Sequence, residues 1–314
     1  MQVSAIIPCR AGEGGPVAGL VSALLGLNDA QLQVIVGVDG HDTPADLVSH
    51  GADPTLSVTT GDRGGPSAAR NRALERADGD LVLFLNDDVM PTPGLIERHR
   101  EAHADRRSRL VLGSAPFAMR EPDRVLDRMT RETSLLFFYN TMDAREPDRD
   151  WGFRHAWTLN LSLPRALCEP FDNRLTHPMF DDLEWAYRVM HSCGAPLVYR
   201  PDASVTHHHR YEPSQILQRE ALLGHQAWAL RQANPDCATT VFGERFDGSS
   251  ESAHEARNLI TPEASQSYRD FEAIAVEPSM QANVHEVFAS ARSWRMAARC
   301  VGYLHALDGA PPPR

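Results

Sequence analysis

This chain of 314 residues predicts an α/β fold, in which helices cover both faces of a mostly parallel sheet, followed by a helical C-terminal extension. Three observations favour this fold. Short apolar segments alternate with helical patterns along the first third of the sequence. These segments are almost continuously apolar, as burial on both faces of a sheet requires, and a long amphipathic pattern lies close to the C-terminus.

The first 115 residues supply the elements of that sheet. An apolar strand ends at Pro8, and residues 16–27 follow with one apolar helical face. In chain order, the next elements are strands at 32–38 and 56–59, a helix at 67–77, a strand at 81–85, a helix at 93–103 and a strand at 110–113. Gly64 and Gly65 precede the helix at 67–77, and Pro66 lies near its first turn.

The sequence changes character beyond residue 115. Residues 141–155 are charged and turn-prone, and they predict a mobile loop beside a functional site. After this loop come strand patterns at 158–163, 198–199 and 204–207, and helical patterns at 182–191 and 213–232. Residues 243–267 are polar, which predicts loops. Residues 284–304 predict one amphipathic helix that packs on the domain or, alternatively, forms a homodimer.

Composition and charge exclude several classes of protein. The chain is 42% hydrophobic and 23% charged, and its formal net charge of -11 disfavours binding to nucleic acid. No segment approaches about 20 consecutive apolar residues, so we expect no transmembrane segment. The N-terminus starts with a strand pattern instead of a signal peptide, and the five scattered cysteines suit a reducing compartment. We therefore expect a cytoplasmic protein.

The sequence contains no lysine, and all 31 basic residues are arginine. Schiff-base chemistry and the lysine of a P-loop are therefore excluded. Anionic groups of a ligand must be bound by guanidinium groups, backbone amides or a metal ion.

An acidic segment at the end of a predicted strand is the strongest indication of function. Asn86, Asp87 and Asp88 follow the strand at 81–85, and ligands of such sheets bind at the carboxyl ends of the strands. Two adjacent carboxylates repel each other unless a cation or hydrogen-bond donors separate them. A divalent metal ion carrying a diphosphate suits this position, whereas a turn before Pro91 is the alternative explanation.

Two further segments reach the same edge of the sheet. Asp39 follows the strand at 32–38 and is suited to accept a hydrogen bond from a uracil imide or a ribose hydroxyl, unless it only forms a turn with Gly40. Gly64 opens a helix whose free amides favour anions, and Arg70 is within reach of a phosphate or of a carboxylate at the edge. Helix capping alone would not need this arginine.

The second half of the chain contributes carboxylates, imidazoles and aromatic rings. Asp181 and Asp182 open a helix, and two acidic residues in tandem exceed what a helix cap needs. His207 ends a strand, and a neutral imidazole beside carboxylates is a good ligand for ions such as Mn²⁺, whereas a surface histidine cluster is the alternative. Trp157 and Trp185 offer rings for stacking on a sugar, unless they belong to the core.

In this order, the segments resemble an inverting family 2 glycosyltransferase with the Rossmann-like GT-A fold. The resemblance covers residues 1–230 and rests on residues 38–40, 64–71, 77–88, 180–188 and 200–207. It implies a nucleotide-sugar-binding half at 1–115, an acceptor and catalytic half of the same domain at 116–235, and a loop-rich and helical extension at 236–314.

The resemblance also implies roles for single residues. Donor binding falls to Pro8, Arg10, Asp39, Gly64, Arg70, Asn86 and Asp87. Asp182 takes the place of the catalytic base, with Asp181 as the alternative, and Asp88 and His207 hold Mn²⁺ or Mg²⁺. The first acidic position of the family's metal-binding motif is the amide Asn86 in this chain, so Asp88 is expected to carry the metal contact.

The implied reaction is a single displacement at an anomeric carbon, from a nucleoside-diphosphate sugar to the hydroxyl of a glycan or a small molecule. UDP is the nucleotide that the family favours. Asp182 removes the proton from that hydroxyl, and its place at a helix start favours the ionised form.

Two other functions stay open. A sugar nucleotidyltransferase would share the metal carboxylates and a glycine-rich segment such as residues 9–15, but that family relies on lysines that this chain lacks. A non-catalytic sugar-nucleotide or glycan-binding module has Asn86 as its only support in the sequence.

Overall fold

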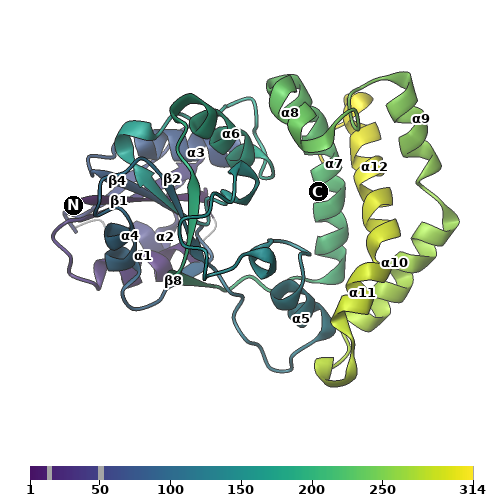
Figure 1. Ribbon diagram of the computed structural model, residues 1–314, viewed down its shortest axis with the longest axis horizontal. Helices are drawn as coiled ribbons and strands as arrows, with labels where there is room; N and C mark the ends of the chain where they lie inside the picture. The colour runs from purple at the N-terminus through teal and green to yellow at the C-terminus, as the bar shows by residue number, and fades with distance from the viewer. Residues whose placement is uncertain (13–15, 49–52, 314) are drawn as a thin grey trace. The chain divides into compact units, whose positions relative to one another are not determined.

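The computed structural model describes residues 1–12, 16–48 and 53–313, and Figure 1 shows its helices and strands. Its internal contacts divide the chain into two units. The first unit comprises Met1–Ala118 and Met142–His209, and the second comprises Met119–Thr141 and Arg210–Arg314. All strands of the described residues lie in the first unit, and the second unit is helical.

The first unit is built on a sheet that has eight strands among the described residues, in the order β3-β2-β1-β4-β7-β6-β8-β5. The strands are β1 (Val3–Arg10), β2 (Leu32–Asp39), β3 (Leu56–Thr59), β4 (Leu81–Leu85), β5 (Val89–Pro91), β6 (Leu110–Ser114), β7 (Asn160–Pro164) and β8 (Leu197–His207). Parallel pairing joins β3, β2, β1 and β4, and also joins β6 to β8. Strand β7 runs antiparallel to β4 and β6, and β5 runs antiparallel to β8. The predicted α/β fold is therefore confirmed, with antiparallel strands in its second half.

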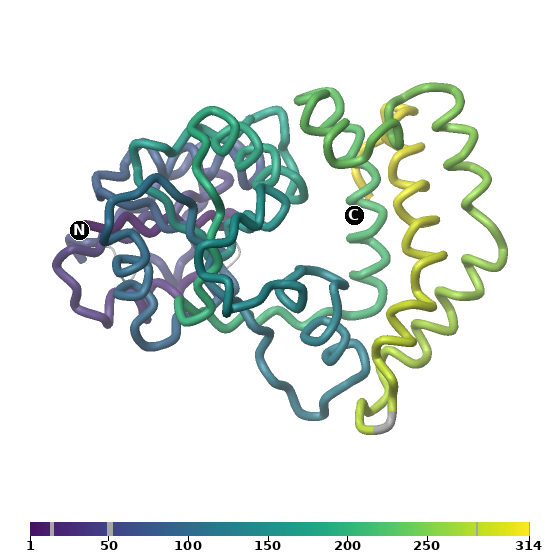
Figure 2. The backbone as a smooth tube through the Cα atoms, viewed as in Figure 1, coloured from purple at the N-terminus to yellow at the C-terminus, as the bar shows by residue number. Residues whose placement is uncertain are grey.

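Helices surround this sheet, with α3 and α6 on one side and α1 and α4 on the other (Figures 1 and 2). The helices of the first unit are α1 (Pro16–Leu25), α2 (Ala45–Val48), α3 (Gly65–Leu74), α4 (Leu95–Ala102) and α6 (Asp181–Cys193), with 3₁₀ turns η2 (Phe153–His155) and η3 (Arg165–Leu167). A close approach of backbones brings α3 onto β2. A Cβ atom at Gly37 would lie 2.1 Å from the carbonyl oxygen of Ala69, so only glycine fits there.

Strand β8 differs from its prediction, because the two short strands predicted at 198–199 and 204–207 form one strand of 11 residues. In the sequence, Pro201 suggests a break between two strands, because proline has no backbone N–H to donate to a β-ladder. In the structure, β8 continues through this proline at an irregular place, where its register against β6 shifts between Gly113 and Ser114.

The second unit consists of helices. They are α5 (Val125–Glu132), α7 (Pro213–Ala233), α8 (Pro235–Phe242), α9 (Ser250–Asn258), α10 (Pro262–Ala275), α11 (Val284–Ser290) and α12 (Arg292–Leu307), with 3₁₀ turns η1 (Tyr139–Thr141) and η4 (Ser279–Gln281). Figure 2 shows α7 and α12 side by side, and these two helices make the most extensive helix–helix contact of this unit. Within the described residues, no helix is both long and apolar enough to cross a membrane.

Two predictions for this part of the chain are wrong. Residues 243–267 were expected to form loops, but α9 and the start of α10 lie there. Their N-caps are Ser249 and Thr261, which accept hydrogen bonds from backbone amides of the first helical turn. The single helix expected at 284–304 is divided into α11 and α12 at Ala291.

Glycines bring α7 and α12 into close contact. A Cβ atom at Gly224 would lie 1.7 Å from the carbonyl oxygen of Arg299, and one at Gly302 would lie 1.7 Å from that of Ala221. Trp294 and Tyr303 of α12 are also buried within this unit. The apolar face of the last helix is therefore used for packing inside the chain. The alternative, a homodimer through the last helix, stays a prediction.

Candidate functional site

The predicted acidic edge lies where strand β4 ends and the chain turns into β5. The backbone amide of Asn86 donates to the carbonyl oxygen of Leu159 at 3.4 Å, just before β7 begins. The carbonyl oxygen of Asp88 accepts from the amide of His208 at 2.9 Å, just after β8 ends. Three segments that are distant in sequence, from β4, β7 and β8, therefore meet at this edge.

Asp88 and His207 form the predicted pair. Antiparallel pairing of β5 with β8 sets Val89 opposite His207, and the Nε2 atom of His207 lies 3.1 Å from Oδ2 of Asp88. His209 approaches the same oxygen at 3.7 Å through Nδ1. Burial pushes the pKa of Asp88 upward, but the hydrogen bond from His207 and the charges of both imidazoles outweigh it and lower the pKa. The carboxylate form of Asp88 is therefore favoured.

The donor atoms at Asp88 suit a divalent cation. Its Oδ1 atom is buried, and no hydrogen-bond donor among the described residues reaches it. A carboxylate oxygen beside an imidazole nitrogen is a ligand set that Mn²⁺ accepts. No cluster of three or more His, Cys, Asp or Glu side chains able to hold a metal ion exists within the described ranges. A metal ion bound by Asp88 and His207 would thus need further ligands from its substrate or from water.

Asp182 lies in the first turn of α6. Its Oδ1 atom accepts from the amide of Leu183 at 2.8 Å, and the amide of Thr158 also hydrogen-bonds to its carboxylate. Burial and the adjacent carboxylate of Asp181 raise the pKa of Asp182 to about 7, against the opposing charge of Arg70. The expected preference of the helix start for the ionised form of Asp182 is therefore opposed by desolvation, which is the larger effect on its pKa.

Arg70 is buried in an ion pair. Its Nη1 atom donates to Oδ2 of Asp181 at 2.7 Å, and both side chains are 6% exposed. The guanidinium carbon also lies 5.3 Å from the ring centroid of Phe171. This position differs from the predicted one, since Arg70 contacts the core instead of lining an exposed nucleotide pocket. The carboxylate of Asp181 is buried in the ion pair with Arg70, so Asp182 is the more exposed of the two aspartates.

Asp39 occupies the helix start that was predicted to bind an anion. Its Oδ1 atom accepts from the amides of Gly64 at 2.7 Å and of Gly65 at 3.0 Å. The anion at the start of α3 is therefore a side chain of this chain. Arg10 is exposed and lies opposite Asp39 in the register of β1 and β2, whereas Pro8 is buried.

The glycine-rich segment at residues 9–15 is described only as far as Gly12, so its predicted part at 13–15 lies outside the described residues. Asp87 is half-buried in the turn between β4 and β5.

The two tryptophans differ in exposure. Trp185 is fully buried, with its ring stacked on Phe171 at a centroid distance of 5.0 Å and Phe84 at its edge at 5.3 Å. The predicted stacking of Trp185 on a sugar is wrong, because both neighbours belong to the core. Trp157 is half-exposed beside His155, at a centroid distance of 5.6 Å, and it directly precedes Thr158. Trp157 is thus the tryptophan of the two whose ring is partly exposed.

Sequence reasoning missed a buried polar residue at the same place. Asn160, the first residue of β7, is fully buried and hydrogen-bonds to β6, to β8 and to His99 of α4. The signal was an amide side chain between Leu159 and Leu161 in an otherwise apolar strand. A buried amide needs partners for all its hydrogen-bonding atoms, which marks such a position as special.

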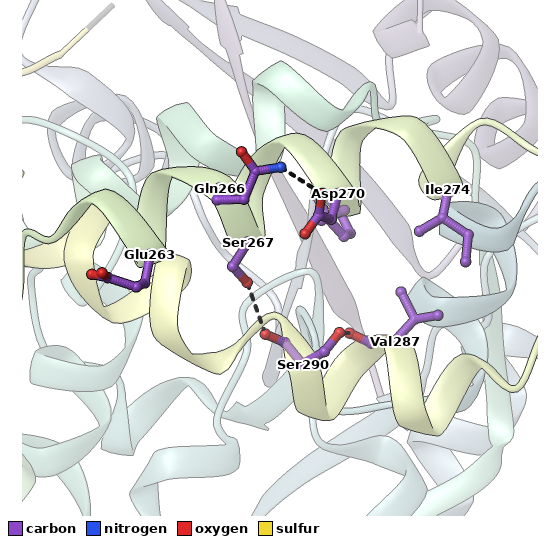
Figure 3. A pocket seen from close by; sticks show the side chains of 8 residues that line it. Glu263, Gln266, Ser267, Asp270, Ile274, Val287 and Ser290 are labelled. Carbon is purple, nitrogen blue, oxygen red and sulfur yellow. Dashed lines mark hydrogen bonds between the residues drawn. The ribbon is translucent and has the colours of Figure 1, made fainter.

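A surface pocket of about 380 Å³ lies in the second unit, between α10 and α11 (Figure 3). Gln266 donates to Asp270 at 2.8 Å, and Ser267 donates to the carbonyl oxygen of Ser290 at 3.1 Å. None of the predicted site residues lines it, and the candidate site is therefore confined to the first unit.

Comparison with known sequences identifies a family. Residues 4–158 match the family model described as glycosyl transferase family 2. The chain is 30% identical over 251 residues to the pre-mycofactocin glycosyltransferase of Mycobacterium tuberculosis, which covers 75% of this chain and 48% of that protein. It is 31% identical over 120 residues to the uncharacterized glycosyltransferase YfnE of Bacillus subtilis, covering 36% of this chain and 30% of that protein. The chain spans about half the length, or less, of the curated relatives it matches.

Comparison with solved structures identifies the fold. The mannosyltransferase PcManGT from Pyrobaculum calidifontis, in complex with GDP-Man and Mn²⁺, superposes with a TM-score of 0.58 at 17% identity, over 96% of this chain and 87% of that chain. Residues 1–349 of S. aureus TarS superpose with a TM-score of 0.51 at 15% identity, over 98% of this chain and 92% of that chain. The chain therefore belongs to glycosyl transferase family 2, and its fold is GT-A.

Proposed function

We propose that this chain transfers a sugar from a nucleoside-diphosphate sugar to an acceptor hydroxyl by a single displacement that inverts the anomeric carbon. The observation that carries the proposal is Asp182, a half-buried carboxyl with its pKa raised to about 7, close to the acidic end of β4. A general base works best when its pKa lies near the working pH. The second carboxylate, Asp181, is engaged in the buried ion pair with Arg70.

The steps follow from the positions of these side chains. The carboxylate of Asp182 accepts the proton of the acceptor hydroxyl while the hydroxyl oxygen bonds to the anomeric carbon. The bond between that carbon and the diphosphate breaks in the same step, so the configuration inverts. Trp157 is half-exposed and directly precedes Thr158, so it is the proposed residue to offer an apolar ring face to the acceptor.

Asp88 and His207 are the residues that would hold a divalent cation, Mn²⁺ or Mg²⁺. The buried, unpartnered oxygen of Asp88 and its neighbouring imidazole fit such an ion. When bound, the cation neutralises charge on the leaving diphosphate. Asn86 supplies an amide where an acidic residue was expected, so the cation site carries one carboxylate fewer.

UDP is the proposed nucleotide, and GDP is its competitor. S. aureus TarS has been solved with UDP and with UDP-GlcNAc, and PcManGT with GDP-Man. The low sequence identity to both leaves the choice to experiment. A thermal-shift panel of nucleoside diphosphates, each with Mn²⁺, with Mg²⁺ and with EDTA, should show the largest stabilisation for UDP with a metal ion.

The catalytic role is tested by Asp182→Asn. This variant should lose transfer or donor hydrolysis by about 10²–10⁴-fold, the usual contribution of a general base, while nucleotide binding stays at the wild-type level. The matched control is Asp236→Asn, which removes an exposed carboxylate at the start of α8. Loss of nucleotide binding in Asp182→Asn would contradict its role as the base. Metal-dependent binding without any turnover in the wild type would instead support a non-catalytic module.

A further inference from the structure

Strand β8 changes partner at an irregularity. Gly113 of β6 pairs with Arg200, but the next residue, Ser114, pairs with Ser204, so three residues of β8 bulge out between them. Beyond this bulge, β8 pairs with β5, and this pairing sets His207 beside Asp88. The bulge therefore determines where the imidazole of the proposed metal pair lies.

The side chain of Asn160 fills this bulge. Its Nδ2 atom donates to the carbonyl oxygens of Ser114 in β6 at 3.0 Å and of Ala203 in the bulged part of β8 at 2.8 Å. A Cβ atom at Gly113 would lie 2.2 Å from the same nitrogen, so the glycine leaves the room that the amide occupies. Since both partners of Nδ2 are carbonyl oxygens, which only accept, the orientation of the amide is fixed.

His99 holds the amide in that orientation, and it belongs to a buried series of hydrogen bonds. Because Oδ1 of Asn160 can only accept, His99 carries its proton on Nε2, 3.0 Å away. The bare Nδ1 of neutral His99 then accepts from the hydroxyl of Ser162 at 2.8 Å. Ser162 in turn accepts from Nε2 of His103 at 2.9 Å. The donor and the acceptor of each of these hydrogen bonds are thereby assigned.

The backbone around Asn160 connects to the other half of the site. Asn160 pairs with Leu85 at the end of β4, and the preceding Leu159 accepts from the amide of Asn86. Thr158, one residue earlier, hydrogen-bonds to the carboxylate of Asp182. One short segment thus contacts the bulge that places His207 and, within two residues, the proposed base.

We propose that Asn160 is a positioning residue that fixes the metal pair, Asp88 and His207, relative to Asp182, with His99 as the support that sets its amide. The proposal rests on the proposed function, because it concerns the same site. Partners that orient metal ligands typically contribute about 10- to 100-fold to metal affinity. The amide should therefore affect metal-dependent nucleotide binding as well as the fold.

The test uses calorimetric titration of the full chain with UDP, and with GDP as the second nucleotide, in Mn²⁺ and in EDTA. Asn160→Asp keeps the shape but replaces both N–H donors by an acceptor that faces two carbonyl oxygens. His99→Leu removes the donor to Oδ1, whereas His99→Gln retains an N–H donor. Ser162→Ala is the matched control. It removes the hydroxyl that donates to His99, and it leaves all direct contacts of the Asn160 amide in place.

We expect Asn160→Asp and His99→Leu to weaken Mn²⁺-dependent nucleotide binding by about 10- to 100-fold, with His99→Gln and Ser162→Ala close to the wild type. The fitted stoichiometry reports the folded fraction, so weaker affinity is distinguished from unfolding. If Asn160→Asp does not fold, the two His99 variants decide the question. Variants with lower melting temperatures but wild-type affinity would overturn the positioning role and leave the proposed function intact. A wild type that binds no nucleoside diphosphate with Mn²⁺ would overturn both.

Discussion

At the scale of single residues, Asp182 differs from an ordinary helix-capping aspartate because its surroundings oppose its charge. Burial and the carboxylate of Asp181 raise its pKa to about 7, and Arg70 only partly compensates. A helix start favours a carboxylate by about 0.3–1 kcal/mol, which is too little to offset desolvation. The pKa of the proposed base is therefore set by its neighbours and not by the helix that carries it.

The raised pKa predicts a pH-dependent rate of transfer. The proposed reaction needs Asp182 as a carboxylate, so the rate should rise with pH and reach half of its maximum near the pKa of about 7. Below that value the rate should fall by about tenfold per pH unit. Initial rates measured across this range, at saturating donor and Mn²⁺, give the profile. A rate that stays constant down to about pH 5 would assign the base an ordinary carboxyl pKa and contradict the structure.

The Arg70–Asp181 pair predicts strong coupling between two substitutions. Both side chains are 6% exposed, so Arg70→Met leaves an uncompensated buried carboxylate at a cost of about 3–5 kcal/mol. Asp181→Leu leaves an uncompensated guanidinium in the same way. The double variant should recover much of the loss, because no charge stays buried. Urea unfolding of the wild type and the three variants measures the coupling, and additive losses would show that the pair is not coupled.

At the scale of elements, glycine at position 113 decides whether the β6–β8 bulge forms. Gly113→Ala places a Cβ atom 2.1 Å from the carbonyl oxygen of Ala203 and 2.2 Å from Asn160. We expect it to lower the free energy of unfolding by about 1–3 kcal/mol, as overpacking does. Gly19→Ala is the matched control, since its Cβ atom in α1 would meet only Met90, at 3.9 Å. That control should stabilise slightly, by about 0.5–1 kcal/mol. Equal effects of the two substitutions in chemical unfolding would argue against the bulge.

Elements that bury a continuous apolar stripe were predictable from the sequence. The strands at 32–38 and 81–85 and the helix at 16–27 were located closely, because their periodicity follows from burial. Strand β8 was predicted as two strands, because Pro201 suggests that a strand ends there. In the structure the proline lies in a bulge, and the bulge depends on the partner strands. The polar helix α9 was missed because only its cap at Ser249 distinguishes it from a loop.

The sequence indicated which types of residue form the candidate site, but it indicated fewer of the contacts that these residues make. The pairing of Asp88 with His207 follows from strand ends that meet at one edge of the sheet. The burial of Arg70 and of Trp185 was not predictable, because it depends on Phe171, which lies 101 residues from Arg70 and belongs to no predicted element. Tertiary neighbours thus decide which polar residues face the substrate.

At the scale of the whole molecule, each of the two units has its own core. The first is the sheet with its helices, and the second is centred on α7 and α12. Glu220 of α7 is fully buried between Arg295 and Arg299 of α12, with N–O distances of 2.9 Å and 2.5 Å. The net effect of burial and these arginines lowers the pKa of Glu220, so it stays charged. This carboxylate therefore connects α7 and α12, the two helices at the centre of the second unit.

Removing the charge of Glu220 should loosen the second unit and leave the first intact. Glu220→Gln leaves two largely buried guanidinium groups without their counter-charge, a loss of about 3–5 kcal/mol for a buried pair. Hydrogen exchange followed by mass spectrometry should then show faster exchange in α7 and α12, with β1 and β4 at wild-type rates. The control is Glu212→Gln, whose carboxylate is 55% exposed beside Arg124 and is worth about 0–1 kcal/mol. Equally faster exchange in β1 and β4 would mean that the two units unfold together, in conflict with two separate cores.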